Sequence, residues 1–176
     1  MIMKKNEAKF QATEIAEMAL MCALMVIGKE ALRMIPNVHP VALIIMLCVI
    51  RYGWKTMYPV LGFVVIQIAL YGFGLWTVMY FYVWPVLVLM CIPIRNIRKG
   101  WIWGLVGGIH GLTFGAMCAV PYIVTSGWKT AVAWWIAGLP FDAIHGVSNF
   151  IIITLLLPLL SRRLERIQGK VELGDK

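Results

Sequence analysis

Between Glu30 and Glu165 the sequence contains one acidic residue, Asp142, and this constrains the fold more than any other feature. Of the 176 residues, 61% are hydrophobic and 14% are charged, whereas soluble domains carry about 25% charged residues. Ionised side chains are costly in lipid, so a long stretch almost without acidic residues is typical of membrane helices. The sequence therefore predicts an all-α integral membrane protein with a single membrane domain, residues 1–176.

Hydropathy predicts a bundle of six transmembrane helices. The second and third are near or below the roughly 20 residues that cross a bilayer, so we expect them to be tilted or shielded by neighbouring helices. The predicted spans are residues 12–32, 40–50, 57–70, 75–94, 101–124 and 131–160.

The basic residues lie between the apolar segments, and 13 of the 16 fall on one side of the predicted bundle. The positive-inside rule makes that side cytoplasmic, so we expect both termini in the cytoplasm of a multi-pass plasma-membrane protein. The net charge of +8 then indicates orientation and not a nucleic-acid partner. The predicted cytoplasmic residues are Lys4, Lys5, Lys9, Arg51, Lys55, Arg95, Arg98, Lys99, Arg162, Arg163, Arg166, Lys170 and Lys176, and the others are Lys29, Arg33 and Lys129.

Asp142 belongs to a polar face of the last predicted span. At about 100° per residue, the side chains of Trp135, Gly138, Asp142, His145 and Asn149 fall within roughly an 80° arc. One interpretation is the wall of a binding site, because polar groups inside membranes are usually functional. The alternative is that Asp142 and His145 bond only each other and the backbone near a proline kink.

Aromatic residues are concentrated on the predicted outer side. An interfacial belt explains part of this pattern, but a belt alone should be balanced between the two sides. The excess indicates an outward-facing pocket that stacks on a flat or apolar ligand. The residues concerned are Tyr71, Phe73, Trp76, Tyr80, Tyr82, Trp84, Tyr122, Trp128, Trp134 and Trp135.

Two predicted spans carry stripes of small residues, which allow close helix approach in membranes. Either stripe can pack within the chain or against another protein. Glu14 and Glu17 flank the first stripe, and we expect them to snorkel or to pair with Lys9. The stripes are Ala12, Ala16, Ala19 and Ala23 in the first span, and Gly104, Gly107, Gly108, Gly111 and Gly115 in the fifth.

Recognisable enzyme chemistry is missing from the sequence, so we expect no catalytic activity. The four cysteines are far apart, without metal-ligand or disulfide spacing, and no phosphate-binding glycine loop occurs. His110 and Gln67 are interpreted as buried core residues. A small proton-coupled secondary transporter, acting as an oligomer with Asp142 and His145 as the proton site, is one possible function.

Three strings resemble the S component of energy-coupling factor (ECF) vitamin transporters, as do the short helical bundle and the alanine stripe. The strings are Ile35-Pro36-Asn37-Val38-His39-Pro40, Tyr71-Gly72-Phe73-Gly74-Leu75-Trp76 and residues 138–150. The resemblance implies a subunit that captures a vitamin at the outer face. It also implies a transmembrane T subunit and two cytoplasmic ATPases as partners, with ATP used by the ATPases and no cofactor in this chain.

The resemblance implies residue roles as well. Ala12, Ala16, Ala19 and Ala23 become the surface that docks on the T subunit. Cobalamin is the favoured vitamin, with pantothenate, a pyridoxine-like ring or a pyrimidine precursor as alternatives. The substrate-binding residues implied are Arg33, His39, Tyr71, Trp76, Tyr80, Trp84, Tyr122, Trp128, Trp135, Asp142, His145 and Asn149.

Overall fold

The computed structural model describes residues 12–174, with side chains through residue 164. Every regular element in this part of the chain is helical. Lys4, Lys5, Lys9 and Lys176 lie outside the described residues, as do the side chains of Arg166 and Lys170. The elements are α1 (Ala12–Ala31), α2 (Val41–Tyr52), η1 (Gly53–Thr56), α3 (Met57–Tyr71), α4 (Leu75–Cys91), η2 (Ile92–Ile94), α5 (Gly100–Leu112), α6 (Phe114–Ser126) and α7 (Trp128–Gly174).

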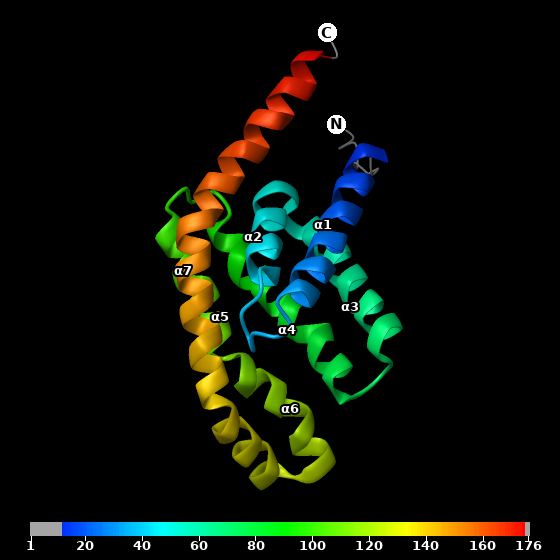
Figure 1. The fold of residues 1–176 in the computed structure, drawn as a ribbon, viewed down its shortest axis with the longest axis vertical. Helices are drawn as coiled ribbons and strands as arrows, with labels where there is room; N and C mark the ends of the chain where they lie inside the picture. Colours follow the sequence, from blue (N-terminus) through cyan, green and yellow to red (C-terminus); the bar gives the residue numbers. More distant parts are fainter. Residues whose placement is uncertain (1–11, 175–176) are drawn as a thin grey trace, which may run out of the picture.

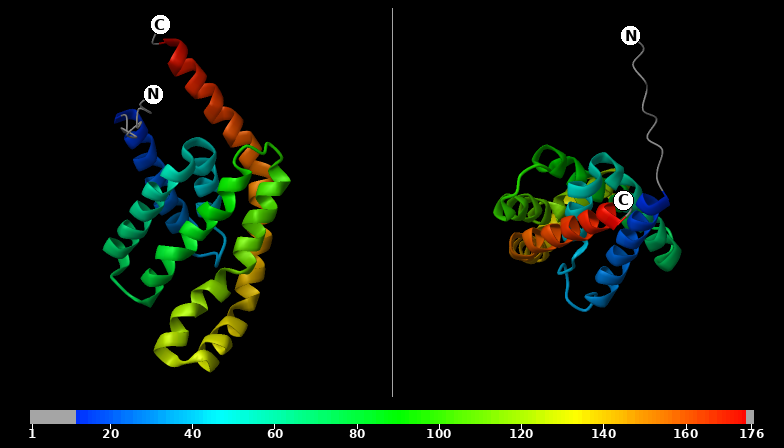
Figure 2. Two further views of the ribbon diagram at one scale, coloured as in Figure 1. Left: turned by 180° about the vertical axis from the view of Figure 1, so that it is seen from behind. Right: turned by 90° about the horizontal axis from the view of Figure 1, so that it is seen from above.

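The helices run up and down between two ends of an elongated bundle (Figure 1). We call the end at which α1 begins and α7 finishes the terminal end, and the opposite end the far end. α2 runs toward the terminal end, and α3 runs back from it after the η1 turn. α6 and the first turns of α7 form an antiparallel pair that projects beyond the other helices at the far end (Figure 2).

Four stretches of the described chain are long and apolar enough to cross a membrane, which is compatible with the predicted membrane protein. They number four and not six for two reasons. The stretch 41–71 contains both α2 and α3, and α1 is not among the four because it carries four charged residues. The stretches are Val41–Tyr71, Leu75–Ile94, Gly100–Ser126 and Trp128–Leu164.

Two predicted spans differ from the observed helices. The span predicted over residues 101–124 is two helices, α5 and α6, which meet at Thr113. The span predicted over residues 131–160 is the 47-residue α7, which continues through Pro140 and Pro158. Pattern reading missed the break because the sequence is uniformly apolar across Thr113, and it ended the last span early because charged residues follow the apolar part.

α2 occupies the centre of the bundle. Residues 41–43 and 45–49 are buried, so the helix is covered on nearly every side. A helix that is apolar all round belongs in the interior of a bundle, and the short length of α2 follows from this position. α1 covers it with Met18, Cys22 and Met25, which share one helix face.

α5 packs along α7 through the predicted glycine stripe. A Cβ at Gly111 would lie 2.8 Å from backbone atoms of His145 and Gly146, and one at Gly104 would lie 2.9 Å from the Phe150 carbonyl oxygen. The two backbones are therefore in direct contact, as small-residue interfaces in membranes allow. This stripe is used within the chain, and it places His110 beside α7.

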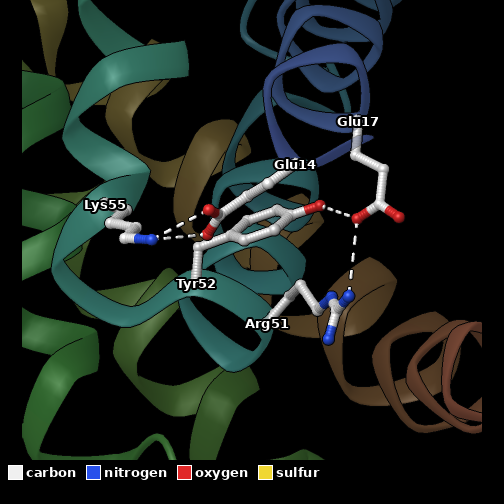
Figure 3. Close-up of polar contacts among 5 residues, drawn as sticks. All are labelled: Glu14, Glu17, Arg51, Tyr52 and Lys55. Atoms are coloured by element: carbon white, nitrogen blue, oxygen red, sulfur yellow. Dashed lines mark hydrogen bonds and ion pairs between the residues drawn. The ribbon is translucent and has the colours of Figure 1, made fainter. Parts of the chain in front are cut away.

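Ion pairs join α1 to the α2–η1 turn near the terminal end (Figure 3). Lys55 Nζ lies 2.8 Å from both carboxylate oxygens of Glu14, and Arg51 lies 3.7 Å from Glu17. The Tyr52 hydroxyl donates a hydrogen bond to Glu17. Glu14 and Glu17 thus pair with basic residues at the end of α2 and in η1.

Candidate ligand-binding site

Seven ring side chains from six parts of the chain meet at the centre of the bundle, and we call them the ring cluster. The α1–α2 connection, α3, α5, α6 and α7 each supply one ring, and α4 supplies two. All three histidines of the sequence belong to it. The members are His39, Phe63, Tyr80, Trp84, His110, Phe114 and His145.

Trp84 lies at the middle of the ring cluster and is fully buried. Its ring centroid is 5.6–6.1 Å from those of five other members, His39, Phe63, Tyr80, His110 and Phe114. His145 completes the cluster, with centroid distances of 4.8 Å to Phe114, 5.2 Å to His39 and 6.5 Å to His110. Such edge and tilted contacts are the favoured geometries of aromatic pairs.

Polar atoms without hydrogen-bond partners are concentrated in the ring cluster. They are His39 Nδ1, Trp84 Nε1, His110 Nδ1 and both ring nitrogens of His145. Roughly 90% or more of buried polar groups in proteins have a partner, and an unsatisfied one costs about 1–3 kcal/mol. Five such atoms on four neighbouring rings make the ring cluster the candidate ligand-binding site.

The hydrogen bond of His110 fixes its tautomer. His110 Nε2 lies 3.0 Å from the carbonyl oxygen of Val83, and because a carbonyl only accepts, Nε2 carries the hydrogen. Nδ1 of the neutral ring is then an acceptor. Trp84 contributes the opposite function, because its indole N–H is only a donor. The cluster therefore offers both donor and acceptor groups between aromatic walls.

His39 lies in the α1–α2 connection, outside the four apolar stretches. Burial lowers its pKa to about 4, and the positive charge of Lys29 contributes in the same direction. Ser148 Oγ lies 3.4 Å from the Asn37 carbonyl oxygen and 3.1 Å from that of His145. The contact with Asn37 joins the connection to α7, and the His39 ring lies 5.2 Å from that of His145.

Asp142 caps a helix inside the bundle. Its Oδ1 accepts a hydrogen bond of 2.9 Å from the Gly115 backbone N–H, in the first turn of α6. The first N–H groups of a helix lack intrahelical partners, and a carboxylate is favourable there. A Cβ at position 115 would overlap Asp142 Oδ2, so the cap requires glycine. The single acidic residue of the apolar stretch 128–164 is thus bonded to the first turn of α6.

The three polar residues of the predicted α7 face have different partners. Asn149 Nδ2 donates to the Gly107 carbonyl oxygen at 3.3 Å, and Asp142 accepts from α6 as described. His145 lies between them and contacts the rings. Asp142 and His145 are therefore not bonded to each other, and the backbone partners of Asp142 and Asn149 lie on α6 and α5.

Seven of the twelve predicted substrate-binding residues lie in or next to the ring cluster. Trp76 packs edge-to-face on Tyr80 at 5.4 Å, which extends the cluster toward the α3–α4 connection. The seven are His39, Trp76, Tyr80, Trp84, Asp142, His145 and Asn149.

The other five predicted residues lie apart from the ring cluster. Arg33 is exposed, and the Tyr71 hydroxyl donates to Glu30, which also pairs with Lys29 at 3.2 Å. The remaining three are on the projecting α6–α7 pair. Tyr122 stacks on Trp134 at 5.2 Å, and Trp128 and Trp135 line a shallow groove of about 170 Å³.

Four further residues lie in this region. Phe63, His110 and Phe114 are cluster members, and Gln67, one turn from Phe63, is fully buried. The interpretation of His110 and Gln67 as buried core residues is confirmed, whereas Phe63 and Phe114 were not predicted. No pattern in the sequence links the three histidines, because each lies alone in a different segment.

The alanine stripe of α1 faces away from the bundle. Ala12, Ala16 and Ala19 are exposed and Ala23 is half-buried. At 100° per residue the stripe lies roughly 100–160° around the helix from the buried residue Met18. One edge of it borders a surface groove of about 390 Å³ between α1 and α3, lined by Ile15, Met18, Ala19, Cys22, Tyr58, Pro59 and Gly62.

All four cysteines are free and buried. Among the described residues, no three His, Cys, Asp or Glu side chains are grouped so that they could hold a metal ion. Comparisons of the chain with protein families, with curated proteins and with solved structures give no match.

Proposed function

We propose that this chain is the ligand-binding S component of an ECF-type vitamin importer. The observation that carries the proposal is the ring cluster, in which aromatic walls surround five buried polar atoms without partners. Binding sites for small molecules combine predominantly apolar and aromatic linings with a few placed polar groups. A ligand that forms hydrogen bonds with these atoms would remove the free-energy cost of burying them without partners.

The geometry favours a small flat heterocycle as the ligand. The centroids of neighbouring rings in the cluster are 4.8–6.5 Å apart, which is direct contact, so a ligand ring would bind only if these side chains moved apart. Neutral donors and acceptors match ring nitrogens and hydroxyl groups better than a carboxylate. Among the candidate vitamins, a pyridoxine-like ring or a pyrimidine precursor therefore fits better than pantothenate or cobalamin, the last of which would require the bundle to open widely.

The transport mechanism is part of the same proposal. α1, α2, α3, α4, the α5–α6 pair and α7 would make six crossings, with both termini in the cytoplasm. The exposed alanine stripe supports docking on a T subunit, because small residues on an outer helix face allow close approach of another helix. Two partner ATPases would then drive release of the ligand to the inner side.

A proton-coupled carrier is the second candidate. Asp142 Oδ2 is buried without a hydrogen-bond partner, and both ring nitrogens of His145 are also buried without one. Intramembrane acidic and histidine residues commonly relay protons. Against this function, Asp142 Oδ1 already accepts the hydrogen bond from Gly115 that caps α6.

The test is co-purification of the tagged chain from its native membrane, with mass spectrometry of bound proteins and of extracted small molecules. The expected result is a T subunit, two ATPases and one heterocyclic vitamin or precursor. A His145→Ala variant should retain the partner proteins and lose the small molecule, because His145 belongs to the ring cluster and not to the alanine stripe.

Recovery of the chain without any ATPase would contradict the importer. Proton-dependent uptake of a solute by the purified chain in vesicles, abolished by Asp142→Asn, would instead support the second candidate. Retention of the same small molecule by His145→Ala would show that the ring cluster is not the binding site.

A further inference from the structure

A basic cavity of about 440 Å³ lies near the terminal end, where the η2–α5 connection crosses between α2 and α7. It is separate from the ring cluster and from the alanine stripe. Its lining residues are Ile50, Arg95, Asn96, Ile97, Arg98, Gly100, Trp103, Leu157, Pro158, Ser161 and Arg162.

The charge of this cavity is positive. Arg95 and Arg98 come from the connection before α5, and Arg162 comes from α7, so basic groups approach from two sides. Among the residues whose side chains the structure describes, no aspartate or glutamate lines the cavity. Arg95 and Arg162 thus bring two basic side chains to one cavity from different parts of the fold.

The connection that carries Arg95 is held in place. The buried indole of Trp103 donates a hydrogen bond of 2.9 Å to the Ile97 carbonyl oxygen, and Ile97 N–H bonds the Ile94 carbonyl oxygen at 2.8 Å. Arg95 packs on Gly53, where a Cβ would lie 2.5 Å from Nη1. Gly53 has φ of 57°, which favours glycine, so the turn leaves room for the guanidinium group.

The lining is also amphipathic. The arginines and Ser161 form one part, whereas Ile50, Trp103 and Leu157 form an apolar part directed to the buried core. Arginine recognises phosphate oxygens through paired hydrogen bonds. Basic pockets between helices at a membrane surface bind the headgroups of anionic lipids.

We propose that this cavity binds a phosphate-bearing anion, held by the guanidinium groups of Arg95 and Arg162. Two sources share this chemistry, the headgroup of an anionic phospholipid and a soluble phosphate compound. The proposal does not depend on the function of the ring cluster.

The test uses the purified full chain in a neutral detergent. Native mass spectrometry measures retention of phosphatidylglycerol against phosphatidylcholine with the same acyl chains, and a thermal-shift titration measures binding of inorganic phosphate and glycerol phosphate. Arg162→Gln should weaken binding of the effective anion about fivefold, which corresponds to about 1 kcal/mol for one basic residue near a membrane surface. Arg95→Gln should do the same.

Arg163→Gln is the matched control, because Arg163 is the exposed neighbour of Arg162 and does not line the cavity. Selective retention of phosphatidylglycerol, lost in Arg162→Gln, supports the site with a lipid occupant. Stabilisation by the soluble phosphates with no lipid preference, lost in the same variant, supports it with a soluble occupant. The proposal is overturned if neither lining variant changes binding of any probe, or if Arg163→Gln causes an equal loss.

Discussion

Replacing Gly111 by alanine is expected to destabilise the bundle by forcing α5 away from α7. The new Cβ would lie 2.8 Å from the Gly146 backbone nitrogen, the Gly146 Cα and the His145 carbonyl carbon. Carbon atoms pack best at about 3.5–4.0 Å, so relief requires a separation of roughly 0.7–1.2 Å. These are backbone atoms of a helix, which cannot rotate aside as a flexible side chain can.

The magnitude follows from two opposing contributions. Overpacking a close interface costs about 1–3 kcal/mol, whereas alanine stabilises a helix interior by roughly 0.5–1 kcal/mol relative to glycine. The expected net loss is therefore about 0.5–2 kcal/mol in the free energy of unfolding. Gly138→Ala is the matched control on α7, because its Cβ would meet no atom within 4 Å.

The assay is unfolding in mixed micelles with increasing SDS, followed by tryptophan fluorescence. Gly111→Ala should unfold at lower SDS than the wild type, and Gly138→Ala at equal or higher SDS. The reasoning about α5–α7 contact is refuted if Gly111→Ala is as stable as the wild type, or if Gly138→Ala loses as much stability.

Three further outcomes are expected. Asp142→Ala should lower ligand affinity by about 1–3 kcal/mol in equilibrium binding, because the buried Oδ2 would no longer accept a hydrogen bond from the ligand; unchanged affinity would separate Asp142 from the site. Ala19→Trp should leave ligand binding unchanged and stop uptake in vesicles with the partner subunits. The control Ala69→Trp, at an exposed position of α3, should leave both binding and uptake unchanged. Equal uptake by the two variants would argue against docking through α1. The lowered pKa of His39 means that the unfolded chain binds more protons than the folded chain below pH 6.5. The stability that His39 contributes should be full above pH 6.5 and fall by up to about 3 kcal/mol as the pH drops to 4. Thermal unfolding should therefore show a smaller loss on acidification in His39→Gln than in the wild type.

Helix positions were largely predictable because the apolar segments are separated by basic and glycine-containing turns. The third predicted span ends at residue 70, and α3 ends at Tyr71. The fourth predicted span starts at residue 75, where α4 begins. The break at Thr113 was not predictable by hydropathy, since the residues on both sides of it are mostly apolar. The spacing of the glycines did predict the face that packs on α7.

The candidate site was predictable only in part. The polar face of α7 and the aromatic residues of α4 are visible in the sequence because each has helical spacing. Convergence of His39, His110 and His145 is a property of the three-dimensional packing, because each histidine is isolated in its own segment. Trp84, Trp128 and Trp135 all lie on the predicted outer side of the sequence. Only the fold shows that Trp128 and Trp135 are on the projecting α6–α7 pair and therefore away from the ring cluster.

The burial of all four cysteines makes the outer surface of α1 open to chemical mapping. A thiol reagent reaches an added cysteine at Ala12, Ala16 or Ala19, each of which is exposed, and Cys22, which lines the neighbouring groove, is replaced first to remove its background signal. Protection of these positions from modification can therefore be followed residue by residue, as a contact footprint of whatever covers that helix in its native membrane.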